Sequence, residues 1–209
     1  MRGLWEDLAA GRPPAGTGGA RVLSDADLPR ALALCAQDPV AAVLATTRLE
    51  QAAAVGLRRA GGQLWGYEVD GTLVGQLNVS QLFFGSLSSC AIGYWIAQRV
   101  AGRGLMPTAV ALATDYCFLQ LGLHRVEICI RPENDPSLRV VEKLGFRYEG
   151  LRRRYIHIDG AWRDHFTFAM TYDEAPFGIL RRWQAGEADP RLARVPDADR
   201  IAAGVSPSS

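Results

Sequence analysis

The stretch that decides the fold of this 209-residue chain is CAIGYWIAQRVAGRGL, residues 90–105. Residues 90–96 are rich in aromatic and β-branched side chains, which predicts a strand. Gly102 and Gly104 follow, and then a mostly apolar helix is expected over about 105–121. Small residues let the backbone approach an anion closely, and the first N–H groups of a helix face that anion. The turn is therefore a candidate pyrophosphate site, while a purely structural turn fits the same glycines.

Spacing excludes two other phosphate-binding motifs. A P-loop needs Gly-Lys followed by serine or threonine, but the only lysine, Lys143, precedes Leu144. A dinucleotide fingerprint needs a third glycine three residues after the second, where this chain has Pro107. The candidate site therefore belongs to neither class of nucleotide-binding protein.

Before this stretch, the sequence predicts two helices and three strands. A short strand is expected at 21–23, and Ser24 with Asp27 is a plausible cap for a helix through about residue 35. Asp38-Pro39 marks the start of a second helix that ends near residue 55. Asp70-Gly71, between strands at 64–69 and 72–80, is a strong hairpin signal.

After this stretch, apolar residues at 126, 128 and 130 alternate with polar ones, which predicts a strand with one buried face. A short helix opens at Asn134 and should stop at Gly145, because glycine tolerates the left-handed conformation at a helix end. A hairpin over 146–155 and 162–170 ends the pattern. The order β-α-α-β-β-β-α-β-α-β-β predicts one mixed α/β (α+β) domain.

Composition narrows the function classes. The chain carries 23 Lys+Arg and 22 Asp+Glu, a net charge of +1, which argues against a DNA-binding protein. No apolar run reaches the roughly 18 residues of a membrane span, and no signal peptide is recognisable, so a cytoplasmic location is expected. The 4 cysteines form no C-x-x-C pair and do not cluster with the 3 histidines, so neither a disulfide framework nor a metal site is expected.

Domain boundaries follow from Gly, Pro and Ser content. Residues 10–20 are rich in glycine and proline, and residues 185–209 hold several prolines and a serine-rich end. We expect a flexible amino-terminal tail over 1–20, a folded domain over 21–175, and a carboxy-terminal helix with a flexible tail over 176–209.

Several motifs in order along about residues 70–185 resemble those of one family. The set is similar to the GNAT superfamily of N-acetyltransferases, and more narrowly to its RimJ/RimL-like branch, the ribosomal-protein alanine N-acetyltransferases. The resemblance implies a GNAT fold over 21–175: a mixed central sheet of about six to seven strands, splayed between strands 90–96 and 124–130 and flanked by helices. The motifs are Ile92-Gly93-Tyr94-Trp95, Arg99-x-x-Gly102-x-Gly104, Arg131-Pro132-Glu133-Asn134 with Ser137, Glu142-Lys143-Leu144-Gly145-Phe146, and Asp159-Gly160-x-Trp162-x-Asp164.

The resemblance also implies acetyl-CoA as co-substrate and no metal. Backbone N–H groups around residues 100–105 would hold the pyrophosphate, with Arg103 or Arg99 as a nearby cation, and the pantetheine arm would lie between the two splayed strands. A free N–H near Ile96 would polarise the thioester carbonyl. The predicted cofactor-binding residues are Ile96, Arg99, Val100, Ala101, Gly102, Arg103, Gly104, Leu105, Asn134 and Ser137.

The acid of the reaction departs from the wider family pattern. Many GNAT enzymes carry a tyrosine five residues before the phenylalanine of Gly-Phe, and here that position is Val141. RimJ/RimL-like enzymes have a serine that matches Ser137, which is the predicted catalytic acid. The alternative for Ser137 is a structural role, in which it only satisfies backbone donors at the start of the helix. Asn134 likewise has two possible roles, as a helix cap or as a cofactor contact.

The base is harder to identify. The carboxylate often found before the Ile-Gly-Tyr strand is replaced by Cys90-Ala91, and the glutamate of the late hairpin by Ile156. Glu127, on the polar face of its strand, is the predicted base, and an ion pair with Arg125 or Arg131 is the structural alternative. The remaining candidates are Asp164, His157, His165 and Tyr94.

The predicted function is acetyl transfer to an amine, by preference a protein N-terminal α-amine of the ribosomal-protein-alanine type. A weak base suffices for an α-amine, whose pKa of about 8 leaves roughly a tenth of it neutral at pH 7. The alternatives are a small-molecule amine as acceptor and a non-catalytic acyl-CoA-binding module. Neither DNA nor a membrane is an expected partner, and the sequence leaves a homodimer open.

Overall fold

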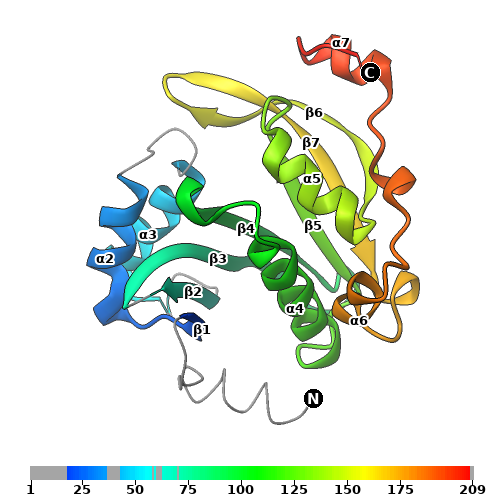
Figure 1. The fold of residues 1–209 in the computed structure, drawn as a ribbon. Coiled ribbons are helices and arrows are strands. Elements are labelled where there is room, and N and C mark those ends of the chain that lie inside the picture. The colour runs from blue at the N-terminus through cyan, green and yellow to red at the C-terminus, as the bar shows by residue number, and fades with distance from the viewer. Residues whose placement is uncertain (1–17, 37–42, 58, 60–62, 70, 208–209) are drawn as a thin grey trace. The chain divides into compact units, whose positions relative to one another are not determined.

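The computed structural model describes residues 18–36, 43–57, 59, 63–69 and 71–207, and Figure 1 shows their course. Seven strands pair in the order β1-β2-β3-β4-β5-β7-β6, which confirms the predicted mixed sheet with helices. The chain divides into two units. The amino-terminal unit comprises residues up to Leu82 together with Gly93–Arg103, and the carboxy-terminal unit comprises Phe83–Ile92 together with the residues from Gly104 onward.

The amino-terminal unit combines antiparallel strands with two helices. β1 (Gly18–Val22) pairs with β2 (Gln63–Val69), which pairs with β3 (Thr72–Phe83). Helices α2 (Leu28–Cys35) and α3 (Val43–Val55) lie side by side (Figure 1). These elements confirm the predicted strand near 21–23, the helix through residue 35 and the hairpin, whereas the expected helix start at Asp38-Pro39 and the turn residue Asp70 lie outside the described residues.

The turn between β1 and α2 is held by the Asp27 carboxylate at the end of a short 3-10 helix, η1 (Asp25–Asp27). This carboxylate accepts hydrogen bonds from the Ser24 N–H at 2.8 Å and the Ser24 hydroxyl at 2.9 Å. The Arg21 guanidinium donates to it as well, with Nη1 at 2.8 Å from Oδ2. Because the hydrogen bond to Arg21 favours the charged form, the pKa of Asp27 lies well below its usual range. The predicted Ser24/Asp27 pairing is therefore reinforced by an arginine.

The sheet of the carboxy-terminal unit is organised around β5 (Arg125–Ile130). Along one edge β5 pairs antiparallel with β7 (Ala161–Thr171), which pairs antiparallel with β6 (Arg147–Ile158). Along the other edge it pairs in parallel with the beginning of β4 (Ser89–Ile96). Alternate residues of β5 are buried and half-buried, which confirms the predicted two-residue period.

Helix α5 (Asp135–Leu144) begins and ends where the sequence predicts. The Asn134 side-chain oxygen accepts a hydrogen bond from the Ser137 N–H at 3.2 Å, which satisfies one of the free donors at the helix start. At the other end, Gly145 has a φ of 69°, a left-handed conformation that favours glycine. Helix α4 (Leu105–Leu119) packs against α5 and β5 in the same unit.

The residues after 175 add three short elements: α6 (Ile179–Gln184), the 3-10 helix η4 (Pro190–Ala193) and α7 (Asp197–Ala202). Ile179 is fully buried. The Arg182 guanidinium donates to the backbone oxygen of Leu144 at 2.7 Å, which places a cation at the carboxyl end of α5. Elements this short have no long apolar stripe, so sequence periodicity indicates only a helix and a tail here.

Asp115 of α4 anchors α6, and its removal should destabilise the fold. Its buried carboxylate accepts hydrogen bonds from the backbone N–H of Ile179 at 2.6 Å and of Leu180 at 3.1 Å. Asp115→Ala is expected to lower the free energy of unfolding by about 2 kcal/mol, because two buried donors lose their acceptor. Urea denaturation measures this change. The matched control is Asp173→Ala, at an exposed aspartate, and equal effects of the two substitutions would contradict the anchoring role.

Candidate functional site

The predicted anion-binding turn connects β4 to α4 through two glycines in left-handed backbone. After β4, the 3-10 helix η2 (Gln98–Val100) leads to Gly102, with a φ of 80°, and Gly104, with a φ of 78°. Gly104 caps α4, and its carbonyl oxygen accepts hydrogen bonds from the Thr108 N–H at 3.1 Å and the Thr108 hydroxyl at 2.9 Å. Because only glycine adopts these φ values readily, both positions require the residue that the sequence provides.

The N–H groups of this turn fall into two sets. Those of Val100 and Ala101 donate to Ala97 at 3.0 Å and to Gln98 at 3.1 Å, so they are engaged within η2 and the turn that follows it. The first N–H groups of α4, by contrast, have no partner inside the helix. They belong to Leu105 and Met106, because the next residue is a proline without an N–H. Met106 is a donor that a search restricted to the glycine motif misses.

Two cations accompany these donors in the sequence. Arg99 and Arg103 are both exposed. Neither forms an ion pair with any residue that the structure describes. The local chain therefore supplies positive charge that the described part of the protein does not neutralise, as a pyrophosphate site requires.

The described pairing of β4 with β5 covers the beginning of β4. This pairing runs from Ser89↔Arg125 to Ala91↔Glu127. On the other side, the Ala97 N–H donates to the Val74 oxygen of β3 at 2.8 Å. Since successive N–H groups point to opposite edges of a strand, the Ile96 N–H points away from β3. This is the orientation expected of the predicted carbonyl-polarising donor.

The predicted acid lies in the first turn of α5. Ser137 is half-buried, and its backbone N–H donates to the side chain of Asn134. The cap role of Asn134 is therefore present, while its contact with a cofactor stays a prediction. Val141, which occupies the position of the tyrosine in many GNAT enzymes, is fully buried in the core.

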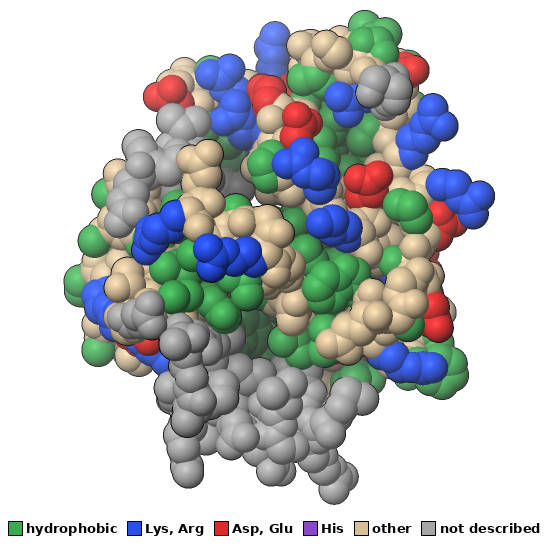
Figure 2. Space-filling model, in the orientation of Figure 1, with side chains coloured by type: hydrophobic (Ala, Val, Ile, Leu, Met, Phe, Trp, Pro, Cys, Tyr) green, Lys and Arg blue, Asp and Glu red, His purple; other side chains and the backbone are tan. Residues whose placement is uncertain are grey.

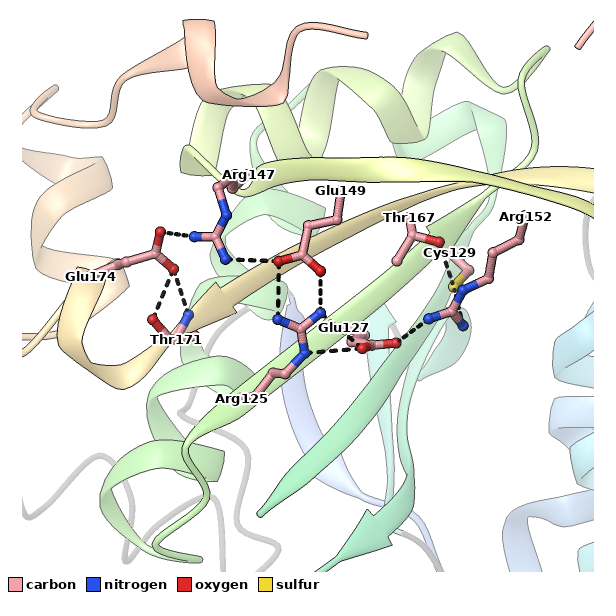
Figure 3. Close-up of polar contacts among 9 residues, drawn as sticks. All are labelled: Arg125, Glu127, Cys129, Arg147, Glu149, Arg152, Thr167, Thr171 and Glu174. Carbon is pink, nitrogen blue, oxygen red and sulfur yellow. Dashed lines mark hydrogen bonds and ion pairs between the residues drawn. The ribbon is translucent and has the colours of Figure 1, made fainter. Parts of the chain in front are cut away.

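Figure 3 shows that the predicted base, Glu127, is part of a chain of alternating charges across β5 and β6. Its Oε1 accepts from Arg125 Nε at 3.0 Å, and its Oε2 accepts from Arg152 Nη2 at 2.8 Å. The ion pair with Arg125 is the structural alternative that the sequence indicates. Each of its two oxygens thus accepts a hydrogen bond from a guanidinium group. The whole chain of charges runs Glu174, Arg147, Glu149, Arg125, Glu127 and Arg152.

The other candidate bases differ in how their lone pairs are used. Asp164 accepts the Arg154 N–H at 2.7 Å, His157 is exposed against the Trp162 ring, and Tyr94 is half-buried. His165 alone among them is fully buried, and in the part of the chain that the structure describes its Nε2 has no hydrogen-bond partner. Its candidacy as a base therefore rests on an unused ring nitrogen.

The tautomer of His165 follows from its surroundings. Nδ1 lies 3.2 Å from the carbonyl oxygen of Arg163, which can only accept, so Nδ1 carries the hydrogen and Nε2 carries the lone pair. Burial lowers the pKa of His165 below its ordinary value, which keeps the ring neutral. In the register of β5 and β7, Ile130 pairs with Phe166, so His165 lies beside the carboxyl end of β5, where the loop to Ser137 begins.

Three further features of the described residues bear on the class of ligand: the surface charge, the character of the helices and the grouping of metal-binding side chains. On the face shown in Figure 2, Lys and Arg side chains are scattered among acidic and apolar ones and form no continuous basic stripe. None of the helices in the described ranges has both the length and the apolar character to cross a bilayer. Over the same ranges, no group of three or more His, Cys, Asp or Glu side chains could hold a metal ion.

Comparison with known proteins gives concordant results. The sequence model of a family described as "Acetyltransferase (GNAT) domain" matches residues 20–147. The Bacillus subtilis protein named Probable N-acetyltransferase YjcK is 41% identical over 101 residues, 48% of this chain and 56% of that protein. The Escherichia coli [Ribosomal protein uS5]-alanine N-acetyltransferase is 37% identical over 99 residues, 47% of this chain and 51% of that protein. The chain thus spans about half the length of the curated relatives it matches.

Among solved structures, Mycobacterium smegmatis RimJ in complex with CoA-disulfide is similar over most of the chain. It superimposes with a TM-score of 0.68 at 34% identity, covering 84% of this chain and 92% of that one.

Proposed function

This chain belongs to the GNAT family of acetyltransferases, and from that premise we propose that it transfers an acetyl group from acetyl-CoA to an amine. Members of the family use acyl-CoA, and the RimJ structure similar to this chain contains a CoA-disulfide. The observation that carries the proposal is the glycine turn: two left-handed glycines lead into the N–H groups of α4 that have no partner inside the helix, and the neighbouring Arg99 and Arg103 form no ion pair with the described residues.

Acetyl-CoA would be bound mainly by backbone groups of the segment from Arg99 to Met106. The N–H groups of Leu105 and Met106 and the positive end of the α4 dipole suit the pyrophosphate. The exposed guanidinium groups of Arg99 and Arg103 supply the opposing charge. Val100 and Ala101 shape the turn, because their N–H groups are already bonded within it. Asn134 positions the start of α5 next to the predicted acid.

The transfer itself is a direct displacement. The neutral amine attacks the thioester carbonyl, a C–N bond forms, and the C–S bond breaks to release CoA thiolate. The Ile96 N–H stabilises the oxygen that becomes negative during attack. His165 Nε2 accepts the proton of the amine, directly or through a water, and the Ser137 hydroxyl donates to the departing sulfur. Glu127 keeps its two guanidinium partners and holds Arg152 and Arg125 in place.

The acceptor that suits this machinery is a protein N-terminal α-amine. At pH 7 roughly a tenth of an α-amine with a pKa of about 8 is already neutral, so a histidine is a sufficient base. One relative supports the same class, because the similar E. coli protein is named [Ribosomal protein uS5]-alanine N-acetyltransferase. A small-molecule amine is the rival acceptor, and steady-state CoA release with a panel of peptides and small amines separates the two.

Ser137→Ala is expected to lower kcat about tenfold and to change the Kd for acetyl-CoA much less, because its hydroxyl is one cofactor contact among many. The loss is modest because a thiol with a pKa near 8.5 is a good leaving group even without an acid. Ser137→Thr keeps the hydroxyl and should retain most of the rate. Full turnover by Ser137→Ala would remove Ser137 from the mechanism without affecting the assignment of the fold.

A further inference from the structure

Buried carboxamides form a polar row on one face of β3. Side chains of a strand alternate between its faces, so Gln76, Asn78 and Ser80 share a face. Gln76 is 3% exposed and Asn78 is 8% exposed. Two long polar side chains in consecutive positions of one buried face are unusual in a strand. Packing in the core of the amino-terminal unit does not by itself explain why Gln76 and Asn78 are buried.

The register places these side chains opposite the second half of β4. The hydrogen bond from the Ala97 N–H to the Val74 oxygen sets Gln76 opposite Trp95 and Asn78 opposite Gly93. A side chain at position 93 would collide with Asn78, because its Cβ would lie only 2.8 Å from Asn78 Oδ1. The absence of a side chain at Gly93 thus makes room for the carboxamide of Asn78 on this face of β4. Gln76 lies one residue away from the position opposite Ile96, the donor to the reacting carbonyl in the proposed function.

Three of the four side-chain nitrogen and oxygen atoms of Gln76 and Asn78 are not satisfied by the described residues. Nε2 and Oε1 of Gln76 and Nδ2 of Asn78 are shielded from solvent and lack a hydrogen-bond partner among the residues described. Leaving buried amide groups unpaired is unfavourable, so such groups are retained where a ligand or an ordered water pairs with them. Three unpaired atoms on adjacent positions of one face point to one ligand with both donors and acceptors.

We propose that Gln76 and Asn78 bind the peptide group next to the α-amine of the acceptor, and so select a peptide over a polyamine. This inference rests on the proposed acetyl transfer. A peptide group offers one N–H and one C=O, which complement the oxygen and the nitrogen of a carboxamide. A polyamine offers only cations and needs anionic partners. Neither β3 nor β4 contains an acidic residue, so these strands offer a polycation no counter-charge.

The test replaces the carboxamide by an apolar side chain of similar length. Gln76→Met is expected to raise the KM for an alanyl tripeptide amide about tenfold while leaving the Kd for acetyl-CoA unchanged. The melting temperature should not fall, because an unpaired buried amide is removed. Gln81→Met is the matched control, since it makes the same exchange at an exposed position of the same strand. A peptide KM within twofold of the wild-type value would overturn the proposal and indicate a buried water only.

Equilibrium binding separates this inference from the transfer reaction. The alanyl tripeptide amide and spermidine are titrated into the CoA-saturated wild-type protein and the Gln76→Met variant. If the wild type does not turn over but binds the peptide at least tenfold more tightly than the variant does, the proposed transfer fails and the peptide site stands. Equal peptide affinity of the two proteins, absence of peptide binding to the wild type, or tighter binding of spermidine than of the peptide would overturn the site.

Discussion

Replacing His165 with glutamine should lower kcat/KM for the acceptor about 100-fold, because the proposed base is lost while the shape of the side chain is roughly kept. The pH dependence should change with it. In the wild type, log kcat/KM should rise with pH through two steps, one for His165 and one for the acceptor amine. In the variant only the amine step should remain. Steady-state kinetics from pH 5 to pH 9 measure both effects, with pH limits set roughly by the two titrations.

The sign of the first step follows from the surroundings of His165. Burial is the main influence and lowers its pKa below 6.5, so the active neutral form is lost only below that pH. The Arg163 carbonyl and the charges of Glu133 and Asp164 act in the opposite direction, while Arg131 acts with burial. From β6, Arg152 is its partner in register and the Tyr155 ring packs edge-on at 5.7 Å. A base step above pH 6.5 would therefore contradict the assignment.

His157→Gln is the matched control for this experiment. His157 is exposed on β6, so its loss should leave both the rate and the pH profile unchanged. If His165→Gln lowers the melting temperature but keeps the two-step pH profile, His165 supports the fold and does not accept the proton.

The double substitution Gly102→Ala and Gly104→Ala should weaken acetyl-CoA binding about 30-fold. An added Cβ fits sterically, since nothing lies within 4 Å at Gly102 and Trp183 is at an ordinary 3.5 Å at Gly104. The cost is conformational, about 1 kcal/mol or more for each left-handed alanine. The free turn can relax to avoid this strain, so binding must restore the strained form and loses the corresponding affinity. Calorimetry with acetyl-CoA measures the change.

Gly204→Ala provides the control for the glycine turn. Gly204 has the same φ of 78° as Gly104 and no atom within 4 Å of an added Cβ, but it lies outside the candidate site. It should lower stability slightly and leave the Kd for acetyl-CoA unchanged. If the double substitution also leaves that Kd unchanged, the turn is structural, which is the alternative that the glycines alone allow.

The elements that the sequence predicts correctly are those with strong local signals. The two-residue period of β5 and the cap pair Asn134 and Gly145 depend on interactions within a few residues, so the sequence alone contains them. The short elements after residue 175 depend instead on contacts with distant residues, such as Asp115 and Leu144. No local pattern records these contacts, and the segment therefore looks like a tail.

The candidate site depends even more on contacts between residues that are distant in sequence. Glu127 is a reasonable base from strand polarity, but its two arginine partners come from β5 and from β6, 25 residues away in the case of Arg152. The unused nitrogen of His165 and the unpaired amides of Gln76 and Asn78 are defined by what does not contact them. Only a three-dimensional structure reveals such absences, whereas the glycine turn is visible in the sequence because the backbone itself requires glycine there.

The most direct test of acetyl transfer to an N-terminal α-amine combines two readouts in one reaction. The 209-residue chain is incubated with acetyl-CoA and an alanine-initiated peptide, CoA thiol release is followed, and mass spectrometry locates the new acetyl group. We predict release of one CoA for each acetyl group found on the α-amine, and no release with the same peptide blocked at its N-terminus. Binding of acetyl-CoA with no acetylated product from any peptide or small amine would contradict this function and indicate a non-catalytic acyl-CoA-binding protein.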